Sequence, residues 1–333
     1  MTPFIVAEIG AAHNGSRDYA RLLVERAAHA GADAVKFQTW DRMSVCADTI
    51  KSGPWAGTSV RELYERAQTP NYWLPDLFAQ ARALGIVPFS TPFDLKSVDV
   101  LEKLNCAMYK IASFEITDLR LIRHVAATGK DIVISTGMAT TPEIYAAVEA
   151  ARDAASITLL YCVSAYPAKP EQFCLPAIRD MAHRFKCHVG ISDHTRGSAI
   201  PVAATALGAT LIEKHIGLDR ASLDGEFVTL PAEFEAIVRE VRAIGKAMEL
   251  KEPIRSYGPK PGEEHSLYFR RSVWVVKDLA AGEIITPDHV DVLRPMGGAR
   301  PEHYGALMGR TVNRSLRRGE PLNLFDLEPA NIS

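Results

Sequence analysis

Each of two short apolar runs in this chain ends in a histidine, His194 within SDHT and His215 within EKH. Imidazole nitrogens are common ligands of divalent transition metals such as Mn²⁺, and water and substrate can occupy the positions that two histidines leave open. Imidazole is also a common general base. The pair therefore predicts either a metal site or a metal-free base beside a structural histidine.

Two lysines lie within apolar runs, Lys36 in AVKFQTW and Lys110 in MYKIAS. Burying an unpaired ammonium group is costly, so each lysine must face an anion. Cations that lie among hydroxyl donors suit a ligand with phosphate and carboxylate groups. The hydroxyl side chains at or near the ends of these runs are Thr91, Ser113, Ser135, Ser164 and Ser192. The alternative is that each lysine pairs with a core glutamate, Glu8 or Glu115.

Two carboxylates, Glu8 and Glu213, also lie at the ends of apolar runs. They could perform general acid–base chemistry or bind substrate hydroxyls, or they could be structural partners of Lys36. His13 follows the first run within HNG, a turn sequence, and either contacts ligand or belongs to a plain turn. The chain has no Walker-type or GxGxxG loop, which argues against a nucleotide cradle.

These polar endings belong to a repeating pattern. Eight β-branched, apolar runs each end in a polar or charged residue, and Ala- and Leu-rich stretches with helical spacing separate them. Eight strand–helix units predict a (β/α)8 TIM barrel, in which the carboxyl ends of the strands carry the chemistry. The predicted strands span residues 4–10, 34–40, 86–91, 108–113, 131–136, 157–164, 188–194 and 209–215.

The gap between the second and third predicted strands, residues 41–85, is long for a barrel connection. It contains GPWAG, a helical stretch over residues 58–66, and a Thr-Pro pair at 69–70. Long ordered loops are usually functional, so we expect an insertion over the barrel mouth. An irregular surface excursion is the alternative.

Length, net charge and cysteine content indicate the broad class of protein. The chain has 333 residues and a net charge of −2, so bulk charge indicates neither a nucleic-acid nor a membrane partner. Five scattered cysteines without CxxC spacing favour a reducing compartment, and neither a signal peptide nor a bilayer-length apolar run is evident. We therefore expect a cytoplasmic enzyme.

The last third of the chain lacks the repeated strand–helix units. An amphipathic helix is predicted at residues 231–250, and residues 251–265 are rich in Lys, Glu, Pro and Gly, as a linker should be. Short strand-like runs, such as residues 272–276, then alternate with turn signals. The prediction is a barrel domain at 1–250, a linker at 251–265 and a small domain at 266–333.

Read in order, the motifs resemble those of the sialic acid synthases, which condense phosphoenolpyruvate with an N-acetylated amino sugar. The matching segments are IVAEIG, HNG, VKFQT, STPF, YKI, STGM, SDHT and IEKH, and the final domain resembles the antifreeze-like (SAF) domain of that family, with Leu-Arg-Pro at 293–295. The sequence ASFEI around Phe114 and the segment 53–70 are most similar to the pseudaminic acid synthases, whereas neuraminate synthases usually carry Gly at the position of Phe114.

The resemblance implies a role for each matching residue. His194 and His215 would bind Mn²⁺, or alternatively Mg²⁺ or Co²⁺, and Glu213 is also a candidate to move protons. The resemblance further implies a homodimer, which would let Arg294 of the final domain reach the sugar in the partner's site. The residues implied at the phosphoenolpyruvate site are Lys36, Thr91, Lys110, Ser113, Ser135, Ser164, Tyr166 and Ser192, and those around the sugar are Glu8, Gln38, Glu213 and Asp224.

Two alternatives accompany this interpretation. The first is a synthase of the same family that uses another N-acetyl amino sugar, namely an N-acetylneuraminate or legionaminate synthase. The second is a non-catalytic carbohydrate- or ice-binding protein built on the same barrel. The intact set of lysines, histidines and glutamates argues against the second.

Overall fold

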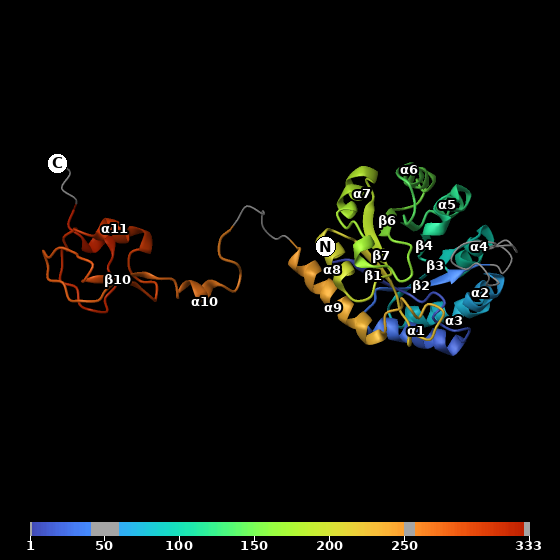
Figure 1. The fold of residues 1–333 in the computed structure, drawn as a ribbon, viewed down its shortest axis with the longest axis horizontal. Coiled ribbons are helices and arrows are strands. Elements are labelled where there is room, and N and C mark those ends of the chain that lie inside the picture. Colours follow the sequence, from blue (N-terminus) through green and yellow to red (C-terminus); the bar gives the residue numbers. More distant parts are fainter. Residues whose placement is uncertain (1, 41–59, 250–256, 330–333) are drawn as a thin grey trace. The chain divides into compact units, whose positions relative to one another are not determined.

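The computed structural model describes residues 2–40, 60–249 and 257–329. The chain divides into two compact units, residues 1–250 and 251–333, and each is described by itself. The described part of the first unit forms a closed barrel of eight parallel strands with helices around it, as predicted (Figure 1). The strands are β1 (Phe4–Glu8), β2 (Ala34–Thr39), β3 (Val87–Pro92), β4 (Met108–Ile111), β5 (Asp131–Ser135), β6 (Ile157–Cys162), β7 (His188–Asp193) and β8 (Leu211–His215).

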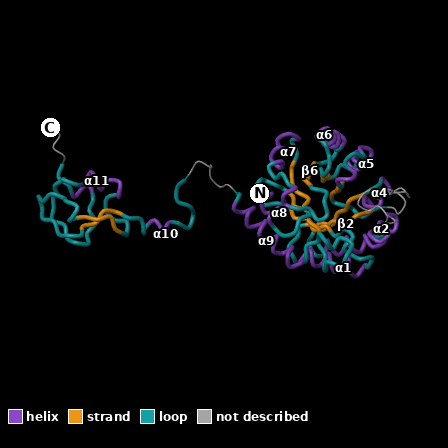
Figure 2. The backbone as a smooth tube through the Cα atoms, viewed as in Figure 1, coloured by secondary structure: helices purple, strands orange, loops and turns teal. Residues whose placement is uncertain are grey.

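The helices of this unit alternate with the strands along the chain, and tracing the backbone by element type makes the alternation plain (Figure 2). An additional helix, α2, precedes α3 in the long connection between β2 and β3. The helices are α1 (Arg17–His29), α2 (Val60–Ala67), α3 (Leu74–Ala83), α4 (Leu95–Lys103), α5 (Leu119–Ala126), α6 (Thr141–Ala150), α7 (Ala177–Phe185), α8 (Ala199–Ala206) and α9 (Pro231–Ala247).

Local sequence explains where several helices begin. Asp94 accepts a hydrogen bond from the backbone N–H of Ser97 at 2.8 Å, and Asp118 accepts one from Leu121 at 3.1 Å. These side chains satisfy backbone donors that the first turn of a helix leaves without partners. The loops that precede α4 and α5 therefore end at defined residues, which helps to hold these two loops at the barrel mouth in place.

The strands end earlier than several apolar runs suggested. β4 stops at Ile111 and β6 at Cys162, whereas the predicted runs extended to residues 113 and 164. The chain leaves the ladder there, so Ser113 and Ser164 lie just beyond the strands. The insertion is seen in part: α2 agrees with the helix predicted at residues 58–66, while GPWAG falls outside the described residues.

The second unit is small and consists of short elements, as the sequence predicted. Its own core is a cluster of buried apolar side chains that includes Val273, Leu307 and Leu322. The described elements are α10 (Glu264–Leu267), β9 (Ser272–Val275), β10 (Val290–Leu293) and α11 (Tyr304–Leu307), with β9 and β10 pairing antiparallel. Across the described parts of both units, the helices are too short or too polar to cross a membrane.

Candidate active site

The register of the barrel places charged side chains next to one another at its mouth. Glu8 at the end of β1 lies opposite Lys36 on β2 and opposite His215 on β8. Ser192 on β7 lies opposite Glu213 on β8. Because side chains alternate along a strand, these residues project toward the same interior space.

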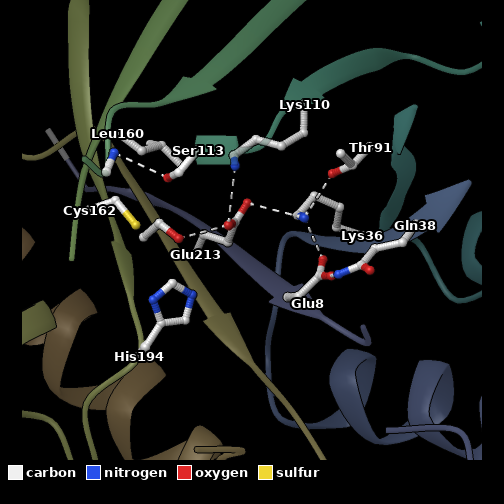
Figure 3. A network of polar contacts seen from close by, with 12 residues as sticks. Glu8, Lys36, Gln38, Thr91, Lys110, Ser113, Leu160, Cys162, His194 and Glu213 are labelled. Carbon is white, nitrogen blue, oxygen red and sulfur yellow. Dashed lines mark hydrogen bonds and ion pairs between the residues drawn. The ribbon is translucent and has the colours of Figure 1, made fainter. Parts of the chain in front are cut away.

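A network of buried ion pairs fills this space (Figure 3). The Nζ of Lys36 lies 2.7 Å from Glu8 Oε2 and 3.7 Å from Glu213 Oε2, and it donates to Thr91 Oγ1 at 3.1 Å. Lys110 Nζ lies 3.6 Å from Glu213 Oε1. The alternative in which lysines pair with core glutamates thus holds for Lys36 and Glu8, whereas the partner of Lys110 is Glu213 rather than Glu115.

Burial and charge pairing compete at each group of the network. Burial lowers the pKa of Lys36, but Glu213 and Glu8 outweigh it and the pKa is raised. For Lys110 burial prevails over Glu213, and its pKa is lowered. Burial would raise the pKa of Glu213, but Lys110 and Lys36 bring it down to about 2. The centre of the mouth therefore holds a carboxylate that stays ionised at neutral pH.

Hydrogen bonds fix the two carboxylates of the network. Gln38 Nε2 donates to Glu8 Oε1 at 2.7 Å, and Ser192 Oγ donates to Glu213 Oε1 at 2.9 Å. One oxygen of each carboxylate, Oε2, is buried with no hydrogen bond within the described residues, although both face Lys36. The predicted residues Gln38 and Ser192 therefore orient the two glutamates.

The other predicted hydroxyls, those of Ser113, Ser135 and Ser164, come from the segments at the ends of β4, β5 and β6. Ser113 Oγ accepts a hydrogen bond from the N–H of Gly137 at 3.1 Å. A Cβ at residue 137 would come within 2.2 Å of Ser164 Oγ and 2.7 Å of Ser113 Oγ, so this approach requires glycine. Ser135 Oγ is buried without a hydrogen-bond partner in the part of the chain that the structure describes. The structure thus brings Ser113 and Ser164 together around Gly137 and leaves the buried Ser135 hydroxyl available to a ligand.

The two histidines lie side by side, with ring centroids 5.4 Å apart. His194 Nδ1 is 3.1 Å from the carbonyl oxygen of Val163, which leaves its Nε2 for another partner. His215 Nδ1 is buried without a hydrogen bond among the described residues and lies 3.4 Å from Asp224 Oδ2. The donor set fits a transition metal that takes two imidazoles and completes its shell with water or substrate. Among the described residues, no group of three or more His, Cys, Asp or Glu side chains could hold an ion by itself.

A cavity of about 370 Å³ opens beside these histidines. Aromatic side chains make up much of its wall, and Phe114 within it is 53% exposed. Among the predicted sugar-site residues, Gln38 and Asp224 line the cavity. Tyr166, which was predicted at the phosphoenolpyruvate site, also lines it, and its ring meets that of His194 at a tilt, with the centroids 4.3 Å apart. The aromatic lining residues are Trp40, Tyr64, Phe93, Phe114, Tyr166 and Phe227.

His13 belongs to the loop architecture of the mouth. Its ring is fully buried, its Nδ1 accepts from the N–H of Gly15 at 3.0 Å, and its Nε2 lies 3.2 Å from Thr69 Oγ1. Burial lowers its pKa, with Asp224 opposing more weakly, which favours the neutral ring. His13 therefore joins the HNG turn to the long β2–β3 connection, and its buried position favours the turn alternative.

Three residues near the site were not predicted to belong to it. Phe227 packs against His215 at 4.8 Å, and nothing in its local sequence indicates this contact. Cys162 Sγ lies 3.9 Å from Ser164 Oγ, and its polar environment was hidden because the residue lies within an apolar run. Glu115 was considered as a lysine partner, yet its Oε2 is buried without a hydrogen bond in the described structure. Burial raises the pKa of Glu115 to about 7, against a smaller opposing effect of Lys110.

Arg294 belongs to the second unit, where it directly follows β10 and is exposed. Ser272 Oγ accepts hydrogen bonds from the N–H groups of Gly297 and Gly298, both at 3.0 Å, and donates to the carbonyl of Pro295 at 3.0 Å. The segment that follows Arg294 is therefore an ordered turn rather than a free strand end.

A closed parallel barrel with buried lysines, carboxylates and paired imidazoles at the carboxyl ends of its strands has the architecture of a (β/α)8 enzyme. Comparison with known proteins gives the family. A model of the NeuB family matches residues 23–252, and a model of the SAF domain matches residues 270–328. The chain therefore belongs to the NeuB family: it is a nonulosonic acid synthase, a phosphoenolpyruvate-using transferase that forms a carbon–carbon bond. This assignment replaces the alternative of a non-catalytic binding protein.

Individual relatives agree with this assignment. The chain is 38% identical to the pseudaminic acid synthase of Helicobacter pylori, with 98% of both chains covered. It is 34% identical to the N,N'-diacetyllegionaminic acid synthase of Campylobacter jejuni, covering 95% of this chain and 97% of that one. The crystal structure of the N-acetylneuraminic acid synthetase of Leptospira borgpetersenii superposes with a TM-score of 0.71 at 30% identity, covering 80% of this chain and 90% of that chain.

The raised pKa of Glu115 predicts a pH effect on stability. A carboxyl group whose pKa is about 7 in the folded protein and 4.5 when free in water stabilises the fold fully below the lower value, and this stability is lost as pH rises through the higher one. We expect the group to reduce the free energy of unfolding by up to about 3 kcal/mol between about pH 5 and pH 8. Urea titrations should show a flatter pH profile for Glu115→Gln, and identical profiles for the two proteins would contradict this.

Proposed function

We propose that this synthase makes pseudaminic acid. In this proposal it condenses phosphoenolpyruvate with 2,4-diacetamido-2,4,6-trideoxy-β-L-altropyranose and releases phosphate by C–O cleavage. The observation that carries the proposal is the aromatic wall of the cavity beside His194 and His215. A 6-deoxy sugar with two N-acetyl groups presents methyl groups that such a wall can cover.

Phe114 is the residue of that wall that best indicates where the sugar binds in this proposal. It leaves 53% of its surface exposed although it lies beside the catalytic mouth. Exposed apolar surface at a pocket commonly marks the place where a ligand binds. A sugar with a methyl group at C6 would bury this ring, whereas the hydroxymethyl group of N-acetylmannosamine would place a hydroxyl against it.

The charged network supplies the phosphoenolpyruvate site in this proposal. Lys36 and Lys110 would bind its phosphate and carboxylate, and the hydroxyls of Thr91, Ser113 and Ser135 would donate to the remaining oxygens. Holding both anionic groups fixes C3 of phosphoenolpyruvate toward the sugar aldehyde in the near-attack geometry that condensation requires. The same cations would stabilise the departing phosphate.

The carboxylates and histidines serve the sugar side. His194 and His215 would hold a divalent ion, Mn²⁺ by preference, which supplies Lewis acidity toward the sugar aldehyde. C3 attacks the aldehyde carbon, positive charge develops at C2, water adds there, and the adduct loses phosphate. Glu213, between the two lysines, would accept a proton from the attacking water, while Glu8, Gln38 and Asp224 bind sugar hydroxyl and amide groups.

The subunit arrangement is also part of the proposal. The protein would act as a homodimer in which Arg294 of one subunit binds the sugar held by the other. Its support is the exposure of Arg294 between Leu293, 40% exposed, and the turn at Met296, 52% exposed. An arginine suits a polyhydroxylated, amide-bearing ligand because its planar fork donates several hydrogen bonds at once.

The first prediction of this proposed function concerns sugar preference. A phosphate-release assay with phosphoenolpyruvate should give a higher kcat/KM for the diacetamido-trideoxy-altrose than for N-acetylmannosamine or for the sugar that legionaminate synthases use. Phe114→Gly, which installs the residue usual in neuraminate synthases, should lower kcat/KM for the preferred sugar roughly 10- to 100-fold, because a pocket wall is lost. Phe114→Leu, which keeps an apolar wall, is the control. A preference for N-acetylmannosamine in the unmodified enzyme would overturn the proposal.

The second prediction concerns the metal. Exhaustive chelation should abolish turnover, and Mn²⁺, Co²⁺ or Mg²⁺ should restore it, because two imidazoles alone supply no Lewis acid. His194→Ala should lose Mn²⁺ binding in calorimetry, whereas His29→Ala, on the outer helix α1, should retain it. Full activity of a chelated enzyme found metal-free by elemental analysis would contradict this.

The third prediction tests the shared site by complementation. Chains inactivated by Arg294→Ala are mixed with chains inactivated by Lys110→Ala under conditions that exchange subunits. Hybrid dimers should regain activity, because one of their two sites combines an intact lysine with an intact arginine from the partner. Arg300→Ala, an exposed arginine of the same unit, should stay active as a control. Confirmed hybrids without activity would place Arg294 in the site of its own chain.

A further inference from the structure

We propose that the buried ion pair between Asp193 and Lys214 is a positioning device that sets His194 against His215. The inference rests on the proposed metal site and extends it to two residues that do not line the mouth. Asp193 and Lys214 each have a relative exposure of 1%, so the pair is closed to solvent. Each residue is the direct chain neighbour of one of the two histidines.

The contacts of the pair converge on the peptide that follows His194. Lys214 Nζ donates to Asp193 Oδ2 at 2.7 Å and to the carbonyl oxygen of Thr195 at 2.5 Å. Asp193 Oδ1 accepts from the N–H of Thr195 at 2.9 Å. Thr195 is therefore held on both its N–H and its C=O, one residue after His194. We call Asp193, Lys214 and Thr195 the clamp.

The clamp connects the two strands that carry the histidines. Asp193 and Lys214 are register partners on β7 and β8, at the carboxyl end of each strand. Because side chains alternate along a strand, Lys214 faces away from the interior that Glu213 and His215 face. The pair thus lies behind the mouth, outside the reach of substrate, and its members are positioning rather than catalytic residues.

Stabilisation of the fold alone does not explain why a buried ion pair occupies this position. Removing two charges from water is expensive, and a well-packed apolar pair of similar volume often stabilises a fold equally well or better. What an apolar pair cannot do is bind both polar groups of Thr195. The peptide after His194 would then lose the contacts that fix its direction, and the ring of His194 could change its distance from His215.

Other contacts of His194 need the same peptide to stay in place. The carbonyl oxygen of His194 accepts from the N–H of Ala168 at 3.1 Å, and His194 Nδ1 faces the carbonyl of Val163. These contacts orient the ring toward the β6 side. The clamp supplies the restraint toward β8, where His215 lies. Partners that orient metal-binding histidines typically change metal affinity about 10- to 100-fold when they are removed.

The experiment measures Mn²⁺ affinity of the metal-free full-length protein by calorimetry, with melting temperature and circular dichroism in parallel. Three variants are compared with the unmodified chain: Asp193→Asn, Lys214→Met, and the double variant Asp193→Leu/Lys214→Met. Asp193→Asn keeps the size and an acceptor for Thr195, so it perturbs folding least. We expect the dissociation constant for Mn²⁺ to rise about 10- to 100-fold in folded Lys214→Met and in a double variant that recovers the melting temperature, and to rise less in Asp193→Asn, which keeps the acceptor for Thr195.

The matched control is the ion pair of Asp33 and Arg242, 2.9 Å apart, at the other end of the barrel. Asp33 also accepts from the backbone N–H of Ile5 at 2.8 Å, so it holds a strand end as Asp193 does. Asp33→Asn should lower the melting temperature and leave Mn²⁺ affinity unchanged. Folded clamp variants that bind Mn²⁺ within twofold of the unmodified chain would overturn the inference alone. An unmodified chain that binds no Mn²⁺ would overturn the metal site and the clamp together.

Discussion

The buried pairing of Lys36 with Glu8 and Glu213 is the interaction on which the mouth of this barrel depends. Glu8 is on β1, Lys36 on β2 and Glu213 on β8, so the three charges meet only when the barrel closes. Removing one partner would leave a buried charge uncompensated, which typically costs about 3–5 kcal/mol. The site and the closure of the fold are therefore coupled through the same three side chains.

This pairing also constrains how an anionic substrate can bind. Lys36 faces Glu8 and Lys110 faces Glu213, so in the proposed binding mode phosphoenolpyruvate would exchange these lysine–glutamate contacts for lysine–ligand contacts. Glu8 can keep its hydrogen bond from Gln38 during that exchange, and Glu213 can keep the one from Ser192. The raised pKa of Glu115 favours its neutral form. In that form Glu115 adds no further negative charge near Lys110. The polar second partners thus let the carboxylates give up a lysine without losing every contact.

The barrel could be predicted from sequence because its signals are local and repeated. Each strand is an apolar run with a polar ending, and the eighth strand must lie next to the first, so Glu8, Glu213 and the lysines were expected on one rim. Contacts that depend on loop paths could not be predicted in this way. Phe227 reaches His215 from the loop after β8, and His13 meets Thr69 across 56 residues of sequence. Neither contact follows from periodicity, since irregular segments carry no repeating pattern. The aromatic composition of the cavity was likewise hidden, because its rings come from segments that are far apart in the sequence.

Charged and aromatic side chains lie at different depths in the barrel mouth. The lysines and Glu213 are almost fully buried among strand residues, whereas Phe114 and Tyr166 are partly exposed and come from segments beyond the strands. Strand positions are constrained by the register of the whole barrel, so a change there disturbs charge pairs on neighbouring strands. Loop positions can change one at a time without disturbing the ladder. A single barrel can therefore keep one condensation chemistry while the loop residues at its rim adapt to different amino sugars. In the function proposed for this chain, side chains such as Phe114 select the sugar, and the charged network beneath them does not.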